Sequence, residues 1–425
     1  MQTNLAPEYK GTTDGLAAEA ILRKCVHCGF CTATCPTYQL LGDELDGPRG
    51  RIYLMKQVLE GATPTRKTQQ HLDRCLSCRS CETTCPSGVD YGHLLDIGRK
   101  LVDAKVPRPL GERALRWALK EGLPSPLFAP AMALGQLARP LLPAALQNKV
   151  PVKQDAGRWP TREHARKILM LAGCVQPAMA PNINRATARV FDAAGIQTVI
   201  APKAGCCGAV KFHLNDQEGG KAEMRANIDA WWPFIEGQKA SSGVEAILMN
   251  ASGCGVTVKE YGHILRDDPV YAAKAARISE LTRDVSEWLP ELAVSLRDKL
   301  PLSDNTTTTQ KALPHIAFHP PCTLQHGQQL RGGVEQHLGA LGFDVKVTGC
   351  EAHLCCGSAG TYSVINPDLA YQLRDRKLGH LNDTFGAEKP DVIVSANIGC
   401  ITHLQSGTTT PVRHWIEVLD EALQK

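Results

Sequence analysis

Two short stretches of the chain contain four cysteines each in the same spacing, and they constrain the fold more than any other feature. The first reads CVHCGFCTATCP over residues 25–36, and the second reads CLSCRSCETTCP over residues 75–86. Both follow the pattern C-x2-C-x2-C-x3-C-P, which binds a [4Fe–4S] cluster in bacterial ferredoxins. A zinc site takes two pairs of ligands and needs neither the third cysteine step nor the terminal Cys-Pro. The two stretches therefore predict two [4Fe–4S] clusters.

The fourth cysteine of each motif is expected to serve the other cluster. This exchange occurs in two-cluster ferredoxins, and it gives two ligand sets that each take three cysteines from one motif and one from the other. The first predicted set is Cys25, Cys28, Cys31 and Cys85, and the second is Cys75, Cys78, Cys81 and Cys35. Such an exchange places the clusters close together, as electron relay requires.

The composition is typical of a globular protein from a reducing compartment. A chain of 425 residues is too long for one ordinary core, so we expect two or three domains. Its 17 cysteines could form disulfides in a secreted protein, but the polar start MQTNLAPEYKGTTDG predicts no signal peptide. Clustered cysteines then indicate metal or redox sites. The formal charge of +4, without a Lys/Arg-rich run, does not indicate nucleic-acid binding.

The longest apolar stretch is not expected to cross a membrane. Residues 127–146, LFAPAMALGQLARPLLPAAL, are interrupted by Arg139 and three prolines. A membrane-spanning helix needs about 20 predominantly apolar residues in a row. We interpret this stretch as packed or linker helices, with a surface that contacts a membrane or a partner subunit as the alternative.

Sequence patterns divide the chain into four parts. Residues 1–110 show helical patterns around the two motifs, and residues 111–166 form a helical linker region that ends in a polar, charged segment. Two α/β domains are predicted to follow, at 167–300 and 314–425. The Ser/Thr-rich stretch LPLSDNTTTTQK between them is expected to be a flexible linker. The predicted fold class is α/β with a mainly α-helical N-terminal domain of the two-[4Fe–4S] ferredoxin type.

Short apolar runs alternate with helical patterns in the two α/β parts. The expected helices include residues 184–194 and 218–234. Buried strands that alternate with helices indicate a parallel sheet. The expected strands are residues 167–173, 196–202 and 244–249 in the first part and 315–318, 343–347 and 391–396 in the second.

A second cysteine pattern occurs once in each α/β part. It reads C-x31-CC-x46-C in the first copy and C-x32-CC-x43-C in the second, at an offset of about 148 residues. An internal duplication explains this regularity. The first set is Cys174, Cys206, Cys207 and Cys254, and the second is Cys322, Cys355, Cys356 and Cys400.

These eight cysteines are candidate ligands or redox groups. A single free cysteine is often a small core residue, but each of these follows an apolar run, where parallel sheets place their binding sites. Each set could bind a further iron–sulfur cluster or zinc, or form a redox disulfide. Cys350 occurs only in the second copy and is a weaker candidate. Four histidines near the second set are candidate neighbours of a metal site, although a lone histidine is usually structural: His319, His326, His353 and His403.

Motifs for organic cofactors are absent from the sequence. It contains no G-x-G-x-x-G between strand and helix, no Walker loop, no H-E-x-x-H and no G-x-S-x-G. We therefore expect no flavin on this chain. Cluster ligands without an organic cofactor site are typical of an electron carrier that serves a partner holding one.

The chain resembles a known family from about residue 20 to its C-terminus. The segments that carry the likeness are CVHCGFCTATCPTYQLLGDELDGPRGRIYLMKQVLEG, HLDRCLSCRSCETTCPSGV, AGCCGAV, NIDAWWP, ASGCG, CTLQH, HLCCGSAGTY, ANIGC and VRHWIE. On these segments it is similar to the glycolate oxidase iron–sulfur subunits. The duplicated Cys…Cys-Cys-Gly…Cys units resemble the cysteine-rich domain of heterodisulfide reductase B subunits.

The resemblance implies a peripheral subunit of an oxidoreductase complex on the cytoplasmic side of the inner membrane. In that family, two flavin-type subunits are the partners, and one of them oxidises glycolate, often also D-lactate, to the 2-oxo acid. This chain would carry the electrons on toward a respiratory-chain acceptor such as a quinone. Substrate oxidation itself would take place in the partner, so no catalytic residue is expected here.

The chain departs from the full pattern of the cysteine-rich domain at one position in each copy. That pattern ends in C-x-x-C, and its first cysteine is replaced here by Ala251 and Asn397. Metal binding by these units is therefore an open question. The alternatives are the iron–sulfur subunit of an anaerobic glycerol-3-phosphate dehydrogenase, a thiol–disulfide enzyme like heterodisulfide reductase, and a redox sensor.

Overall fold

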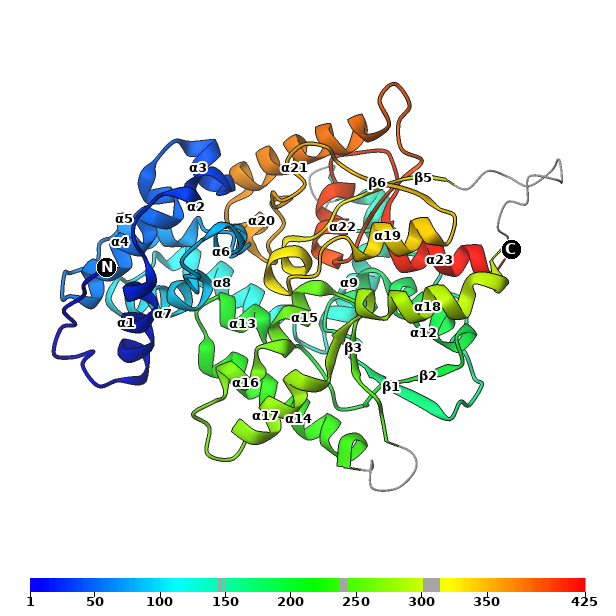
Figure 1. Cartoon of the computed structure of the whole chain (residues 1–425), viewed down its shortest axis with the longest axis horizontal. Helices are drawn as coiled ribbons and strands as arrows, with labels where there is room; N and C mark the ends of the chain where they lie inside the picture. The colour runs from blue at the N-terminus through cyan, green and yellow to red at the C-terminus, as the bar shows by residue number, and fades with distance from the viewer. Residues whose placement is uncertain (144–146, 148–149, 237–242, 301–313, 425) are drawn as a thin grey trace.

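The computed structural model describes residues 1–143, 147, 150–236, 243–300 and 314–424. N-terminal helices form one end of the molecule, and two four-stranded parallel sheets with their helices form the rest (Figure 1). The predicted fold class is thus confirmed. The predicted linker at 300–311 lies almost wholly outside the described residues.

The N-terminal part consists of helices that enclose the two cysteine motifs. Helices α1 and α4 pack against α7, with Leu22, Leu59 and Leu94 fully buried between them. The side chain of Thr12 caps α1 by accepting a hydrogen bond from Gly15 N at 3.0 Å. The helices are α1 (Thr13–Lys24), α2 (Phe30–Ala33), α3 (Pro36–Leu41), α4 (Pro48–Leu59), α5 (Arg66–Asp73), α6 (Ser80–Thr84) and α7 (Tyr91–Lys105).

Two further helices, α8 (Leu110–Gly122) and α9 (Phe128–Ala138), lead to the first sheet. No side chain of α9 is buried, and Leu134 and Leu137 are exposed. The helical part of the expectation for residues 127–146 is correct, but α9 is less packed than expected, and residues 144–146 lie outside the described part. Within the described residues, no helix combines the length and the apolar character that crossing a bilayer requires.

The first sheet has the strand order β2-β1-β3-β4, with all strands parallel. Helices α12 (Pro181–Ala193) and α14 (Gln217–Glu236) correspond to the two expected helices. The strands are β1 (Arg166–Met170), β2 (Ile196–Val199), β3 (Ile247–Met249) and β4 (Thr282–Asp284).

The second sheet repeats this topology in the order β6-β5-β7-β8. Each of the six apolar runs predicted as strands overlaps one of the observed strands. The fourth strand of each sheet was not predicted, because three residues are too few to show a periodic pattern. The strands are β5 (His315–Phe318), β6 (Asp344–Val347), β7 (Val392–Ser395) and β8 (Val412–His414).

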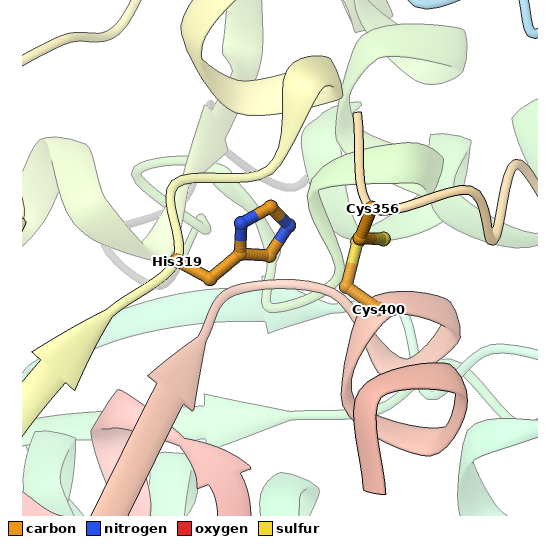
Figure 2. A group of neighbouring side chains, drawn as sticks. All are labelled: His319, Cys356 and Cys400. Carbon is orange, nitrogen blue, oxygen red and sulfur yellow. The ribbon is translucent and has the colours of Figure 1, made fainter. Parts of the chain in front are cut away.

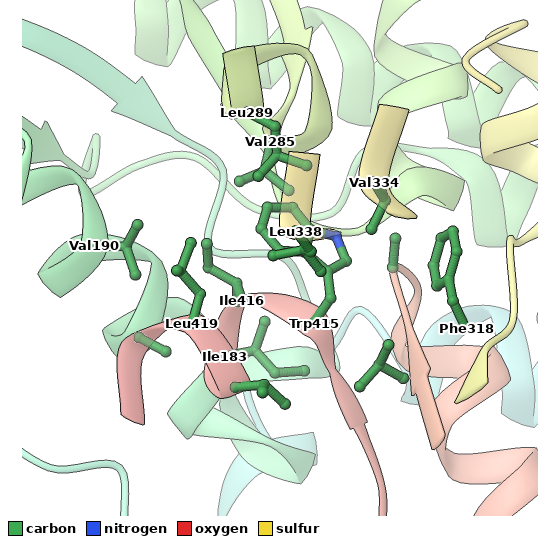
Figure 3. Packing of buried hydrophobic residues seen from close by; sticks show 14 of the residues in the cluster. Ile183, Val190, Val285, Leu289, Phe318, Val334, Leu338, Trp415, Ile416 and Leu419 are labelled. Atoms are coloured by element: carbon green, nitrogen blue, oxygen red, sulfur yellow. The ribbon is translucent and has the colours of Figure 1, made fainter. Parts of the chain in front are cut away.

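The two sheets exchange their last helices. Helix α18 (Leu289–Leu296), which follows β4, packs against α19 (Gly333–Ala340) of the second copy, whereas α23 (Trp415–Leu423), which follows β8, packs against α12 of the first. Figure 3 shows the resulting contacts, with Leu289 near Leu338. Residues 167–300 and 314–425, which the sequence predicts as separate domains, therefore share one hydrophobic core.

Candidate iron–sulfur and thiol sites

The two cysteine motifs adopt the same unusual backbone turn. His27 and Gly29 in the first motif have φ angles of 58° and 86°, and the equivalent Ser77 and Arg79 in the second have 52° and 58°. Such left-handed residues are uncommon outside glycine and recur where a loop wraps a ligand. The identical spacing in the sequence therefore folds into identical local geometry.

The first cavity collects four cysteines from both motifs. Cys25, Cys28, Cys31 and Cys85 line it together, and Cys81 of the second motif is also part of its wall. Burial, with the neighbouring Cys25 thiol, raises the pKa of Cys31 to about 11. The predicted first set is therefore brought together in space.

The second cavity holds the other four cysteines. Its wall contains Cys35, Cys75, Cys78 and Cys81, and none of the first three cysteines of the first motif. Burial raises the pKa of Cys78 and Cys81 well above the usual range, and nearby thiols add to both shifts, Cys322 most at Cys78 and Cys78 most at Cys81. Each cavity thus collects three cysteines of one motif and the fourth cysteine of the other, which is the arrangement that the predicted exchange requires.

The donor sets of both cavities fit a [4Fe–4S] cluster. Three of these thiols, Cys31, Cys78 and Cys81, resist ionisation, because burial strips the thiolate of its hydration and neighbouring thiolates repel it. Bound iron supplies the positive charge that stabilises the thiolates, and metal binding then releases their protons. A cluster held there would supply one-electron transfer.

Hydrogen bonds reach the sulfur atoms of the second cavity. Ser77 N donates to Cys75 Sγ at 3.4 Å, and the Tyr91 hydroxyl donates to the same sulfur at 3.6 Å. The Cys35 sulfur and the Thr37 hydroxyl lie 3.3 Å apart. Donors to ligand sulfur stabilise the more negative state of a cluster and raise its reduction potential.

A buried arginine lines the second cavity and was not predicted. The Arg51 side chain is 1% exposed and donates to His71 O at 2.7 Å and to Thr37 Oγ1 at 3.1 Å. Its Nη2 also lies 3.4 Å from Asp46 Oδ1, and Asp46 accepts a second bond from Arg74 Nη1 at 2.8 Å. Arg51 thus places a positive charge beside the thiols of the second set.

Nothing in the sequence of residues 42–51, GDELDGPRGR, indicated that two of its charged side chains would be buried. Charged residues are mostly exposed, so Arg51 and Asp46 carried no sign of burial. The one sequence feature that could have pointed to these two residues is the high density of charged residues in this short segment between the two motifs.

The first duplicated set also converges. The Cys174 and Cys207 thiols hydrogen-bond Cys206 and lower its pKa, and Cys207 contacts Cys254 as well. Glu223 approaches Cys206, and burial raises the pKa of the Glu223 carboxyl to about 7. All four predicted cysteines of this copy are therefore neighbours, with an acidic group beside them.

The second duplicated set forms a deeper cluster. Cys322 Sγ and Cys355 Sγ lie 3.8 Å apart, and Cys356 interacts with both Cys355 and Cys400. All four thiols are buried, whereas Cys350 is exposed. Cys350, which the sequence offers as a weaker candidate ligand, is therefore not one of the buried thiols of this cluster.

One glycine in each copy permits the sharp turn after the paired cysteines. Gly208 and Gly357 both have φ = 90°, a conformation that other residues rarely adopt. A Cβ atom on Gly208 would lie 2.7 Å from Gly220 O, and one on Gly357 would lie 2.4 Å from Ala370 O. The glycine of the Cys-Cys-Gly triplet is therefore required by both conformation and space.

The second cavity and the second duplicated set are neighbours. The Cys78 thiol lies close enough to Cys322 and Cys355 for their charges to interact, and all three belong to one apolar cluster. The Tyr362 hydroxyl spans the same boundary by donating to Arg74 O at 3.1 Å. Cys78 of the second cavity and two cysteines of the second duplicated set are thus neighbours in one apolar cluster.

Comparison with known proteins agrees with this arrangement. The 4Fe–4S dicluster domain family matches residues 21–89, and the cysteine-rich domain family matches residues 168–259 and 316–405. Both cysteine-rich matches end before the exchanged helices α18 and α23.

Two relatives cover all or nearly all of the chain, and a third covers part of it. The glycolate oxidase iron–sulfur subunit of Escherichia coli (strain K12) is 55% identical over 100% of both chains. The probable glycolate oxidase iron–sulfur subunit of Bacillus subtilis (strain 168) is 30% identical over 94% of this chain and 91% of its own. Lactate utilization protein A of Bacillus licheniformis is 23% identical over 60% of this chain and 99% of its own. This chain belongs to the family of glycolate oxidase iron–sulfur subunits.

Proposed function

We propose that this chain is the electron-relay subunit of a glycolate-oxidising complex. The observation that carries the proposal is the packing of Cys78 beside Cys322 and Cys355 in one apolar cluster, which joins the ferredoxin-type region to the duplicated region. Its full-length likeness to the Escherichia coli subunit supports glycolate as the electron source and favours it over glycerol 3-phosphate.

The eight ferredoxin-type cysteines are proposed to hold two [4Fe–4S] clusters. Cys25, Cys28, Cys31 and Cys85 would ligate the first, and Cys75, Cys78, Cys81 and Cys35 the second. A [4Fe–4S] cluster moves one electron, whereas oxidation of a 2-hydroxy acid releases two. A flavin in a partner subunit can accept the pair and pass it on singly.

The surroundings of the two cavities suggest the order of transfer. Cys28 is exposed, and Val26 and Phe30 beside it are 68% and 62% exposed. An exposed apolar edge at the first cavity suits contact with the flavoprotein, because electrons transfer well only over short distances. The second cavity is buried against the duplicated region, so electrons would enter at the first cluster and leave through the second.

The remaining features of the complex follow from the same proposal. Two flavin-type subunits would be the partners, and a quinone would be the acceptor at the cytoplasmic face of the inner membrane. The duplicated cysteines would hold a further iron–sulfur cluster or zinc next to the relay.

The test uses the complete complex with either the wild-type chain or the Cys28→Ser or Cys78→Ser variant. Glycolate and glycerol 3-phosphate are compared as donors, with a quinone analogue as acceptor. We expect glycolate to reduce the quinone in the wild type, and each variant to lose both one low-temperature EPR signal and quinone reduction. A small dye that takes electrons directly from the flavin should still be reduced in all complexes. Quinone reduction that survives in Cys28→Ser, or that requires glycerol 3-phosphate, would contradict the proposal.

A further inference from the structure

His319 occupies a position where its ring has no protein partner. It follows β5 directly, and its side chain is 1% exposed. Its main chain is fixed on both sides, because His319 N donates to Val394 O at 2.8 Å and its carbonyl accepts from Ser395 Oγ at 3.0 Å. Neither Nδ1 nor Nε2 of the ring has a hydrogen-bond partner. Buried polar atoms without a partner are rare in proteins and call for an explanation.

The ring points toward two cysteines of the second duplicated set. One ring nitrogen of His319 and the sulfur atoms of Cys356 and Cys400 all lie within 4.8 Å of one another, and all three residues are buried. Figure 2 shows the imidazole extending from the end of β5 toward both cysteines. Asn397, where the full cysteine-rich pattern has a cysteine, donates from Nδ2 to Cys400 Sγ at 3.7 Å. This amide orients a sulfur of the group.

Two other histidines of this region, His326 and His403, have hydrogen-bond partners on their rings. His326 shares hydrogen bonds with Thr83 Oγ1 at 2.9 Å and with His353 O at 2.8 Å. The first copy has no imidazole at the equivalent position, because Leu171 follows β1 where His319 follows β5. The combination of a partnerless imidazole and converging thiols is therefore specific to the second copy.

We propose that His319, Cys356 and Cys400 ligate a metal in the second copy, so that this site has mixed nitrogen and sulfur ligation. Imidazole with thiolates suits zinc and the iron of a cluster, and two thiolates with a neutral imidazole balance a divalent ion in a buried site. In an iron–sulfur centre, a histidine in place of a cysteine raises the reduction potential. This proposal adds a metal site to the proposed electron relay. Only the role of the metal in electron transfer rests on the relay proposal, because ligation itself is measured without glycolate turnover.

The test compares the full-length wild type with two variants, His319→Leu and His319→Cys. The leucine variant carries the residue that the first copy has at the equivalent position, Leu171. His337→Leu, on α19 of the same copy, is the matched control. Iron and zinc are counted per chain, and X-ray absorption at the zinc edge, or nitrogen hyperfine coupling of a reduced iron centre, detects the ligating nitrogen. Zinc, or iron beyond the roughly eight atoms of two cubane clusters, identifies the metal.

We expect the nitrogen ligand, at about 2.0–2.1 Å for zinc, in the wild type and in His337→Leu. It should be lost in His319→Leu and be replaced by sulfur in His319→Cys. A wild type with only about eight irons and no zinc, or a nitrogen signal that persists in His319→Leu, overturns the proposal. If His319→Leu fails to fold, His319→Cys decides: sulfur in place of nitrogen supports the assignment, and an unchanged signal refutes it. Activity with glycolate is assayed separately, so a failure of the relay proposal remains distinguishable.

Discussion

Arg79 and Glu260 form a two-point ion pair across 181 residues of sequence, with Arg79 Nη2 at 2.9 Å from Glu260 Oε2. Arg79 directly follows Cys78 in the second motif, whereas Glu260 lies at the end of α15 (Ser252–Lys259) in the first duplicated copy. His93 Nε2 reaches the same carboxylate at 3.3 Å. Burial alone would raise the pKa of Glu260, but the hydrogen bonds from His93 and Arg79 lower it to about 2.

Glu260→Gln is expected to weaken the docking of the ferredoxin-type region on the first copy. The substitution keeps the shape of the side chain but leaves Arg79 without its counter-charge, at a cost of roughly 1–3 kcal/mol, as for other hydrogen bonds to charged groups. Glu280→Gln is the matched control, because Glu280 pairs with Arg277 on the surface and is 67% exposed. Thermal unfolding of the cluster-loaded protein should show a lower midpoint for Glu260→Gln only. Equal midpoints in the two variants would show that the pair does not hold the regions together.

The same substitution should show a defined pH dependence through His93. Burial disfavours the charged ring, but the hydrogen bond to Glu260 outweighs it and raises the pKa of His93. A raised pKa contributes stability that is fully present below the unfolded pKa of about 6.5 and is lost as the pH rises through the folded value. The variant lacks this contribution at every pH. The difference in unfolding midpoint between wild type and Glu260→Gln should therefore be larger at about pH 6 than at about pH 8.5, and a difference that grows with pH would contradict the assignment.

The exchange of ligands between the motifs can be tested with two single substitutions. In the proposed arrangement Cys85→Ser affects the first cluster and Cys35→Ser affects the second, although each cysteine belongs to the motif of the other cluster. The EPR spectrum of reduced Cys85→Ser should therefore match that of Cys28→Ser, and the spectrum of Cys35→Ser should match that of Cys78→Ser. The opposite matching would mean that each motif ligates its own cluster.

Features that depend on residue spacing and on regular secondary structure were predictable from the sequence. The spacing of the motifs implied that Cys85 joins the cysteines around Cys28, and the cavities agree with it. The cysteines at strand ends were expected to converge because parallel strands end at one edge of a sheet, and Cys322 and Cys355 lie 3.8 Å apart. Such inferences depend on regular geometry alone.

Features that depend on contacts between distant segments were not predictable in this way. Nothing in the pattern of α23 distinguishes packing on its own sheet from packing on α12 of the other copy, because both bury the same apolar face. His319 and Arg51 likewise differ from surface residues only through what the fold places around them. Burial of a polar side chain is a property of the assembled structure, so a single sequence does not reveal it.

Gly357→Ala should disrupt the second thiol site, whereas Gly360→Ala should be tolerated much better. Both glycines have positive φ, at 90° and 63°, so both substitutions cost about 1 kcal/mol of backbone strain. Only at Gly357 would the new Cβ also meet the Ala370 carbonyl oxygen at 2.4 Å, while nothing lies within 4 Å at Gly360. Accessibility of Cys356 to a thiol reagent under native conditions should rise in Gly357→Ala and stay near the wild-type level in Gly360→Ala. Equal protection in both variants would mean that the turn adapts.

The charge pair beside the second cavity should set the reduction potential of the second cluster. Arg51 stabilises the added electron and Asp46 opposes it, because both are buried where the effective dielectric constant is low. Arg51→Met should lower the potential by tens of millivolts, and Asp46→Asn should raise it. Arg49→Gln is the control, since Arg49 lines the first cavity and its side chain is 36% exposed, so that solvent screens its charge.

Redox titration followed by EPR separates these effects from a loss of structure. The iron content of each variant must equal that of the wild type, which shows that no cluster has been lost. Opposite shifts for Arg51→Met and Asp46→Asn, confined to the second signal, are expected because the two charges have opposite sign. Shifts in the same direction would indicate that altered packing or solvent access, rather than charge, controls the potential. A shift of the first signal by Arg51→Met would place Arg51 beside the wrong cluster.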